Sequence, residues 1–197
     1  MAQYHHGNLR NALLTIATEL LAEDGVHALS LRKMAQRAGV SHNAPYMHFA
    51  DKEAVLAAIA EEGFRELSVE VESAISQAST TRLQLIAASS AYVNFALNHP
   101  NQVKLMFCPY DEEKYPSLIE SSQASLHLLF NLVKIGQEKR EIISGNTQEM
   151  TKAIWAMVHG VATLSIAYKT NNLLPGKIST EETISVFMDC LLDGLAA

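Results

Sequence analysis

Residues 30–49 constrain this 197-residue chain more than any other stretch, because they contain two short helical segments separated by a glycine. Ser30 is a suitable N-cap, and the apolar residues that follow it recur at helical spacing. Gly39 can adopt the left-handed conformation that ends a helix, and Ser41 can cap the next one. Two helices joined by a glycine-containing turn predict a helix-turn-helix, whose second helix enters the DNA major groove.

The predicted second helix, residues 42–49, carries side chains that suit contact with DNA. Asparagine can make two hydrogen bonds to adenine, and tyrosine and histidine can reach phosphate oxygens. Proline is tolerated only in the first turn of a helix, so Pro45 requires this helix to start late or to bend. We expect base reading from His42 and Asn43, and the further expected DNA contacts are Ser30, Arg32, Ser41, Tyr46 and His48.

The flanks of this motif make it more specific. An amphipathic segment upstream ends in Glu23-Asp24-Gly25, and the block Tyr46-Met47-His48-Phe49 is followed by Lys52. Over roughly residues 8–65 this arrangement resembles the TetR (tetracycline repressor) family of transcription regulators. The resemblance implies a dimeric regulator that responds to a small molecule, and it implies that Lys52 contacts a DNA phosphate.

A second motif, Trp155-Ala-Met-Val-His159-Gly160, places Trp155 and His159 on one helix face, because they are four residues apart. It resembles the Trp-His-Gly signature of one TetR subgroup's C-terminal domain. The function of this pair is not implied. His159 is either a hydrogen-bonded core histidine or a residue that lines an effector pocket.

The charge of the chain is unevenly distributed. The net charge of −6 is unusual for a DNA-binding protein, but residues 1–52 hold five Lys and Arg against four Asp and Glu. The acidic residues therefore lie mainly beyond residue 52. Since the helix-turn-helix region has few cations, we expect few phosphate contacts per subunit and a contribution from a second copy.

Hydrophobic periodicity predicts helices along the rest of the chain and no strands. We expect an all-α fold of about nine helices, with a three-helix DNA-binding domain at residues 1–66 and a larger effector-binding and dimerisation domain at residues 67–197. Asp51 is the expected N-cap of the helix that joins them, and Phe49 is expected in the core.

The last two helices, about 147–170 and from about 180, are apolar around more than one face. A helix that is apolar all round is buried, and in a chain of this size a second subunit is the natural cover. We therefore expect these helices to form half of a four-helix dimer interface. The alternative is that they form the centre of a monomeric core.

An effector pocket is also expected in the C-terminal region. Small-molecule sites are lined mainly by apolar and aromatic side chains with a few polar groups. Each candidate residue could equally be plain core, and an apolar or aromatic effector would suit them. The predicted lining residues are Tyr92, Phe95, Met106, Phe107, Phe130, Trp155 and His159.

The sequence contains no set of residues typical of catalysis, such as a phosphate-binding glycine loop, a nucleophile elbow or paired carboxylates. We expect no enzymatic activity, no metal and no cofactor. Cys108 and Cys190 are predicted to be free thiols in a reducing cytosol. The most apolar stretch, residues 153–168, is expected to be too short to span a membrane, so the predicted location is the cytoplasm.

Together these patterns predict a dimeric repressor that an effector releases from a palindromic operator in double-stranded DNA. Three alternatives stay open. The first is a small-molecule-binding protein or enzyme with an incidental helix-turn-helix. The second is an activator, and the third is a regulator that needs a co-repressor.

Overall fold

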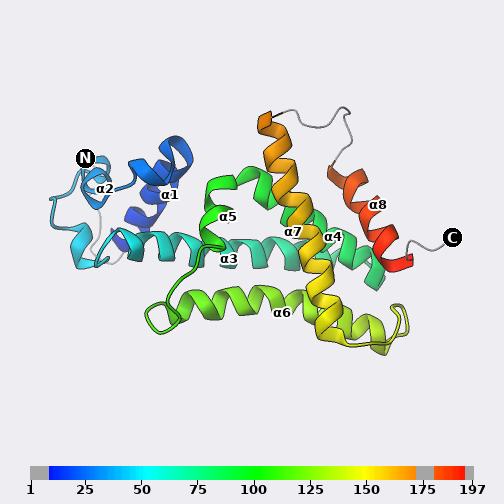
Figure 1. Cartoon of the computed structure of the whole chain (residues 1–197). Coiled ribbons are helices and arrows are strands. Elements are labelled where there is room, and N and C mark those ends of the chain that lie inside the picture. Colours follow the sequence, from blue (N-terminus) through cyan, green and yellow to red (C-terminus); the bar gives the residue numbers. More distant parts are fainter. Residues whose placement is uncertain (1–8, 172–179, 194–197) are drawn as a thin grey trace. The chain divides into compact units, whose positions relative to one another are not determined.

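The computed structural model describes residues 9–171 and 180–193, and within these ranges it contains helices and no strands (Figure 1). The predicted all-α fold is therefore confirmed. The elements in chain order are α1 (Leu9–Ala28), α2 (Leu31–Ala38), the 3₁₀ helix η1 (Pro45–Met47), α3 (Lys52–Ser76), α4 (Thr81–Asn98), α5 (Pro100–Met106), α6 (Pro116–Glu138), α7 (Thr147–Asn171) and α8 (Thr180–Asp193).

The described residues thus form eight α-helices where nine helices were predicted. The exception is the helix expected at residues 42–49, which is reduced to a turn and the three-residue η1. The other helices begin and end near their predicted positions, because capping residues and prolines mark their boundaries. Asp51 caps α3 as expected, since its carboxylate accepts a hydrogen bond from the N–H of Ala54 at 2.8 Å.

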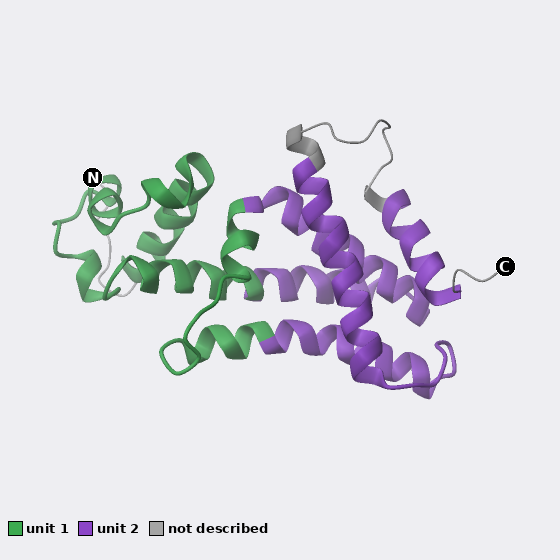
Figure 2. Cartoon of the chain, in the orientation of Figure 1, with its two compact units in different colours: residues 1–64, 101–122 green, residues 65–100, 123–197 purple. Residues whose placement is uncertain are grey.

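The chain divides into two compact units (Figure 2). Unit 1 consists of residues 1–64 and 101–122, and unit 2 consists of residues 65–100 and 123–197. Unit 1 therefore contains the helix-turn-helix region, α5 and the first turns of α6. The functional division at residues 66 and 67 stays a prediction.

Unit 1 has a core built mainly by one face each of α1, α2 and α3. Leu13, Leu20, Met34 and Ile59 are fully buried, and Phe49 is buried as predicted, with 3% of its surface exposed. Burying an aliphatic or aromatic side chain of this size stabilises a fold by about 1.5–3 kcal/mol. These contacts hold the short helix α2, which is too short to be stable alone.

Unit 2 is organised around α4, which packs against both α7 and α8. Val93, Phe95, Ala162, Ile184 and Met188 are almost completely buried in these helices. Arg82 at the start of α4 forms ion pairs with two carboxylates of α8, at 2.7 Å to Asp189 and 2.5 Å to Asp193. Because these side chains are exposed, burial of the apolar side chains contributes most of the stability of this packing.

Candidate functional site

The first helix of the helix-turn-helix, α2, has both of its predicted caps. The Ser30 hydroxyl accepts a hydrogen bond from the N–H of Lys33 at 3.2 Å. Gly39 has φ 67°, a left-handed conformation that glycine adopts without strain, and the N–H of Val40 bonds back to the carbonyl of Ala35 at 3.1 Å. The chain therefore leaves α2 in a fixed direction toward the segment that was predicted to contact DNA.

That segment is not the expected α-helix, and Pro45 explains why. A proline has no N–H, so position 45 cannot donate the helical bond to the carbonyl of Ser41. The N–H of Ala44 bonds to Ser41 instead, at 3.0 Å, and Tyr46 and Met47 also donate to residues three positions back, each at 3.2 Å. Such bonds form 3₁₀ geometry, so a tighter, shorter turn follows Gly39.

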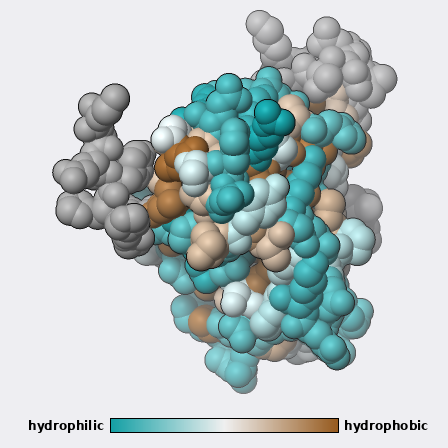
Figure 3. Space-filling model, turned by 90° about the vertical axis from the view of Figure 1, so that its left-hand side faces the viewer, coloured by the Kyte–Doolittle hydropathy of each residue, from teal (hydrophilic) through white to brown (hydrophobic). Residues whose placement is uncertain are grey.

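The predicted base-reading and backbone-contacting side chains of this segment lie at the surface. Ser41, His42, Asn43 and His48 are exposed, and 57% of the Tyr46 surface is accessible. The face shown in Figure 3 is mostly hydrophilic with small apolar areas between. Met47, which is not among the predicted DNA contacts, is 83% exposed in the same turn.

The basic residues of α2 differ in whether they are already paired with a carboxylate. Lys33 pairs with Asp24 at 2.5 Å, and Arg37 makes two hydrogen bonds to Glu23, at 2.5 and 2.7 Å. Hydrogen bonding to these cations lowers the pKa of both carboxyl groups. Arg32 is exposed and makes no hydrogen bond or ion pair with any residue that the structure describes.

Lys52 is held in place by the protein itself. Its ammonium group donates a hydrogen bond to the carbonyl of Val26 at 2.6 Å, and the side chain is half-buried. An ammonium group has three N–H donors, so this bond leaves two for other partners. The predicted phosphate contact of Lys52 stays a prediction, and its structural bond is a feature that sequence reasoning did not find.

In unit 2 the structure brings together three of the predicted effector-binding residues. The Tyr92 hydroxyl lies 2.7 Å from Nδ1 of His159, and the Trp155 ring stacks on His159 at a centroid distance of 5.7 Å. Burial lowers the pKa of His159 and raises that of Tyr92. Both groups are therefore neutral near pH 7, with the tyrosine as donor and the imidazole nitrogen as acceptor.

The other predicted effector-binding residues lie elsewhere. Phe95 is 1% exposed and its ring packs on His99 at 4.8 Å, while the Phe130 ring lies 5.9 Å from His127. Met106 and Phe107 belong to unit 1, where Phe107 meets Phe64 edge to face at 5.8 Å. Their predicted role in binding an effector stays a prediction.

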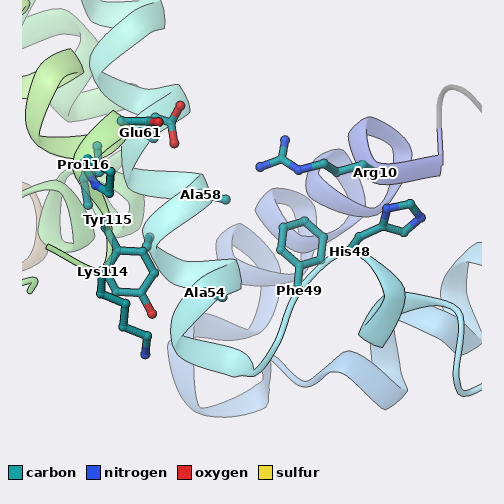
Figure 4. Close-up of a pocket in the computed structure, with 12 residues that line it drawn as sticks. Arg10, His48, Phe49, Ala54, Ala58, Glu61, Lys114, Tyr115 and Pro116 are labelled. Carbon is teal, nitrogen blue, oxygen red and sulfur yellow. The ribbon is translucent and has the colours of Figure 1, made fainter.

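Unit 1 contains a cavity of about 210 Å³ that sequence reasoning did not find (Figure 4). We call it the Arg10 pocket. It is lined by Arg10 of α1, by His48 and Phe49, by small residues of α3 and by residues 114–118. No local pattern predicts it, because three stretches distant in the sequence form its walls, namely α1, residues 48–61 and residues 114–118.

Among the described residues, no group of three or more His, Cys, Asp and Glu side chains could hold a metal ion. One described helical stretch, Thr147–Ala167 of α7, is long and apolar enough to cross a membrane. The expectation that this region is too short is therefore wrong. A core helix outside a membrane passes the same test, so this helix alone does not place the chain in a membrane.

Comparison with known proteins decides the family. Residues 13–59 match the model "Bacterial regulatory proteins, tetR family", and residues 85–189 match the model "Tetracyclin repressor-like, C-terminal domain". The second match covers more than half of the chain. This chain belongs to the TetR family. The subgroup expected from the Trp-His-Gly motif is not confirmed, because the matching model describes a different family of TetR-type C-terminal domains.

Two named TetR-type relatives match parts of the chain. The HTH-type transcriptional activator FasR of Mycolicibacterium smegmatis is 31% identical over 98 residues, which are 50% of this chain and 45% of FasR. The tetracycline repressor protein class A from transposon 1721 of Escherichia coli is 47% identical over 51 residues, which are 26% of this chain and 24% of that protein. The matches therefore span less than half of each relative's length.

Solved structures match the whole TetR fold. A protein of unknown function from Rhodococcus sp. RHA1 is 36% identical, with 100% of both chains covered and a TM-score of 0.85. The regulator FadR of Bacillus subtilis, in complex with stearoyl-CoA, is 19% identical, with 94% of this chain and 99% of that chain covered and a TM-score of 0.75. At that identity the second likeness shows the fold alone.

Proposed function

We propose that this TetR-family protein is a sequence-specific DNA-binding transcriptional regulator. It acts as a homodimer that represses from a palindromic operator and is released by a small-molecule effector. The observation that carries the proposal is the capped helix-turn-helix, because Ser30 and Gly39 fix a turn whose exposed side chains suit the major groove.

In this proposal His42 and Asn43 read bases, since both are exposed at the start of the turn after Gly39. Tyr46 lies beside them and positions the DNA backbone. The other proposed backbone contacts are Ser30, Arg32, Ser41, His48 and Lys52. Few of these residues are cationic, so much of the affinity has to come from two half-sites bound at once.

The proposed dimer interface is the outer face of α7 and α8. Both helices bury one face against α4, yet they also expose apolar side chains: Leu164 is 52%, Val186 60% and Phe187 45% exposed. Ala153 and Ala156 on the exposed face of α7 allow close approach of another helix. The proposed partner on this face is a second copy of the chain, because a palindromic operator requires two DNA-binding domains related by a two-fold axis.

The proposed effector is an apolar or aromatic molecule bound in residues 67–197. Tyr92, Trp155 and His159 support this, since they combine aromatic surface with one polar pair. The structurally similar FadR of Bacillus subtilis holds stearoyl-CoA. Linkage requires that the effector lower DNA affinity by the same factor by which DNA lowers effector affinity.

Activation is the second candidate, because FasR is an activator whereas the class A tetracycline protein is a repressor. The two readings share the DNA-binding step and differ in its effect on transcription. We place the protein in the cytoplasm, where DNA and effector are both accessible.

Selection of bound duplexes from a random DNA pool, at a stated salt concentration, tests the proposal. We expect a palindrome whose half-sites are about one helical turn apart or a multiple of it. The Asn43→Ala/Tyr46→Ala variant should recover no common sequence. If the folded wild-type dimer also recovers none, with or without cell extract as a source of co-repressor, the proposal is wrong.

A further inference from the structure

We propose that the Arg10 pocket binds a phosphate-type oxyanion, at a site separate from the proposed effector site in unit 2. Its floor is formed by alanines of α3 at positions 54, 57 and 58, whose short side chains leave the space open. Water occupies about 30 Å³ per molecule in the liquid, so a cavity of about 210 Å³ has room for a tetrahedral oxyanion and a few waters.

Arg10 is the proposed anchor of the anion. Its guanidinium carbon lies 5.4 Å from the centroid of the Phe49 ring. That ring is held in place by the core, because only 3% of the Phe49 surface is exposed. The Arg10 side chain is exposed and makes no ion pair or hydrogen bond with a described residue. A planar guanidinium matches phosphate through two parallel hydrogen bonds.

The opposite wall of the pocket adds donors from the backbone. The 23-residue helix α6 starts at Pro116, and its first helical bond runs from the N–H of Ile119 to the carbonyl of Tyr115 at 3.3 Å. The N–H groups of Ser117 and Leu118 have no backbone acceptor in the described part of the chain. They lie at the positive end of the helix dipole, where anions bind favourably.

The remaining charged groups of the lining set the strength of binding. Lys114 lies on the same wall as α6 but pairs with Glu53 at 2.9 Å and with Asp51 at 3.7 Å, which offsets its charge. Glu61 is a carboxylate in the lining and opposes an anion, whereas the His48 ring can offer an N–H donor to one. Arg10 and the start of α6 are therefore the groups that recognise the ligand.

A bound oxyanion would bridge the two walls. Figure 4 shows Arg10, His48 and Phe49 on one side of α3 and the residues of the other wall across from them, namely Lys114, Tyr115 and Pro116. The first wall contains the end of the helix-turn-helix, so the anion would join that motif to the segment before α6. The phosphate could come from the operator backbone or from a free phosphorylated molecule.

Titration with inorganic phosphate, at constant ionic strength with chloride as the balancing ion, tests the site in the full-length protein. Amide signals of Ser117 and Leu118 in ¹H–¹⁵N spectra should shift saturably. Arg10→Gln should weaken the apparent affinity at least fivefold, and Ala54→Glu, which places a carboxylate on the pocket floor, should do the same. The control Arg140→Gln removes an exposed arginine outside the lining and should leave the affinity unchanged.

Equal phosphate affinity in wild type and Arg10→Gln, or no saturable shift at either amide, would overturn the proposal. The source is resolved by DNA binding: if the operator backbone fills the site, Arg10→Gln reduces the slope of log affinity against log salt by about one. If the slope is unchanged while phosphate still binds, the ligand is a free phosphate. Neither result tests the proposed operator recognition, which the DNA selection experiment tests separately.

Discussion

The ammonium group of Lys52 donates a hydrogen bond to the backbone carbonyl of Val26 at 2.6 Å. Lys52 is the first residue of α3, and Val26 directly follows Gly25, whose φ of 76° interrupts the helical geometry of α1. The bond therefore ties the start of α3 to the end of α1. It fixes the frame in which α2 and the following turn are held within unit 1.

Replacing Lys52 by methionine should lower the free energy of unfolding by about 1 kcal/mol, because it leaves a half-buried carbonyl without its donor. Denaturant unfolding followed by circular dichroism measures this change. The matched control is Lys104→Met, since Lys104 is exposed in the same unit and should tolerate the change. Equal stability of the two variants would contradict a structural role for Lys52.

Pro45→Leu should lengthen η1 into an α-helix, because the new backbone N–H at position 45 can bond to the carbonyl of Ser41. Leucine also keeps the buried site apolar. We expect helical ¹³Cα shifts over residues 43–48 and slow hydrogen exchange at amide 45. Fast exchange at that amide in a folded variant would show that another contact, and not the proline, keeps the turn short.

Asn43→Ala should reduce affinity for the selected operator by about 1–3 kcal/mol and relax the preference at one base position. Arg32→Gln should instead weaken binding to all sequences alike and reduce the salt slope by about 0.9. Fluorescence anisotropy at several salt concentrations separates the two effects. The assignment is wrong if Asn43→Ala weakens all sequences equally.

The pH dependence of stability should report the burial of His159. Burial lowers its pKa from the ordinary value of 6.5, so the unfolded chain binds more protons just below that pH. This contribution is fully present above pH 6.5 and is lost as the pH falls through the lowered pKa. Histidine titrates in about the range from pH 7 to pH 5. Over this range the free energy of unfolding should therefore fall less in His159→Gln than in the wild type.

The control for this measurement is His127→Gln, because the side chain of His127 is exposed. It should retain the pH dependence of the wild type. If His159→Gln and His127→Gln have the same profile, the half-buried His159 does not control acid stability, and the Tyr92 hydrogen bond tolerates protonation of the ring.

Phe187→Glu should dissociate the proposed dimer, because it places a charge among the exposed apolar side chains of α7 and α8. Sedimentation velocity should show a folded monomer at concentrations where the wild type is dimeric. The control Ile143→Glu changes a residue that is 72% exposed outside α7 and α8, and it should remain dimeric. A dimeric Phe187→Glu protein would place the interface elsewhere.

Most of the fold follows from local sequence rules. Helical periodicity located the α-helices, and caps such as Ser30, Asp51 and Gly39 marked their ends, because capping depends on residues only a few positions apart. The helix at residues 42–49 was the error. Pro45 predicts a late start or a bend, but whether a helix bends or takes 3₁₀ geometry depends on how the turn packs, and Pro45 is buried.

The candidate sites were less accessible to sequence reasoning. Lys52 and Val26 form a hydrogen bond although they are 26 positions apart, and no periodic pattern in the sequence predicts such a contact. Aromatic residues suggested one effector pocket, yet a ring such as Phe95 packs as core and Phe107 belongs to unit 1. The Arg10 pocket depends on small residues of α3 meeting distant segments, which only the fold reveals.

The most direct test of the central claim is the ratio of affinities for the selected operator and for a shuffled duplex of equal length, measured for the wild-type protein at one physiological salt concentration. A specific regulator should prefer the operator by about 10³-fold or more. In the Asn43→Ala/Tyr46→Ala variant the ratio should approach one. A wild-type ratio near one would contradict sequence-specific DNA recognition by this chain.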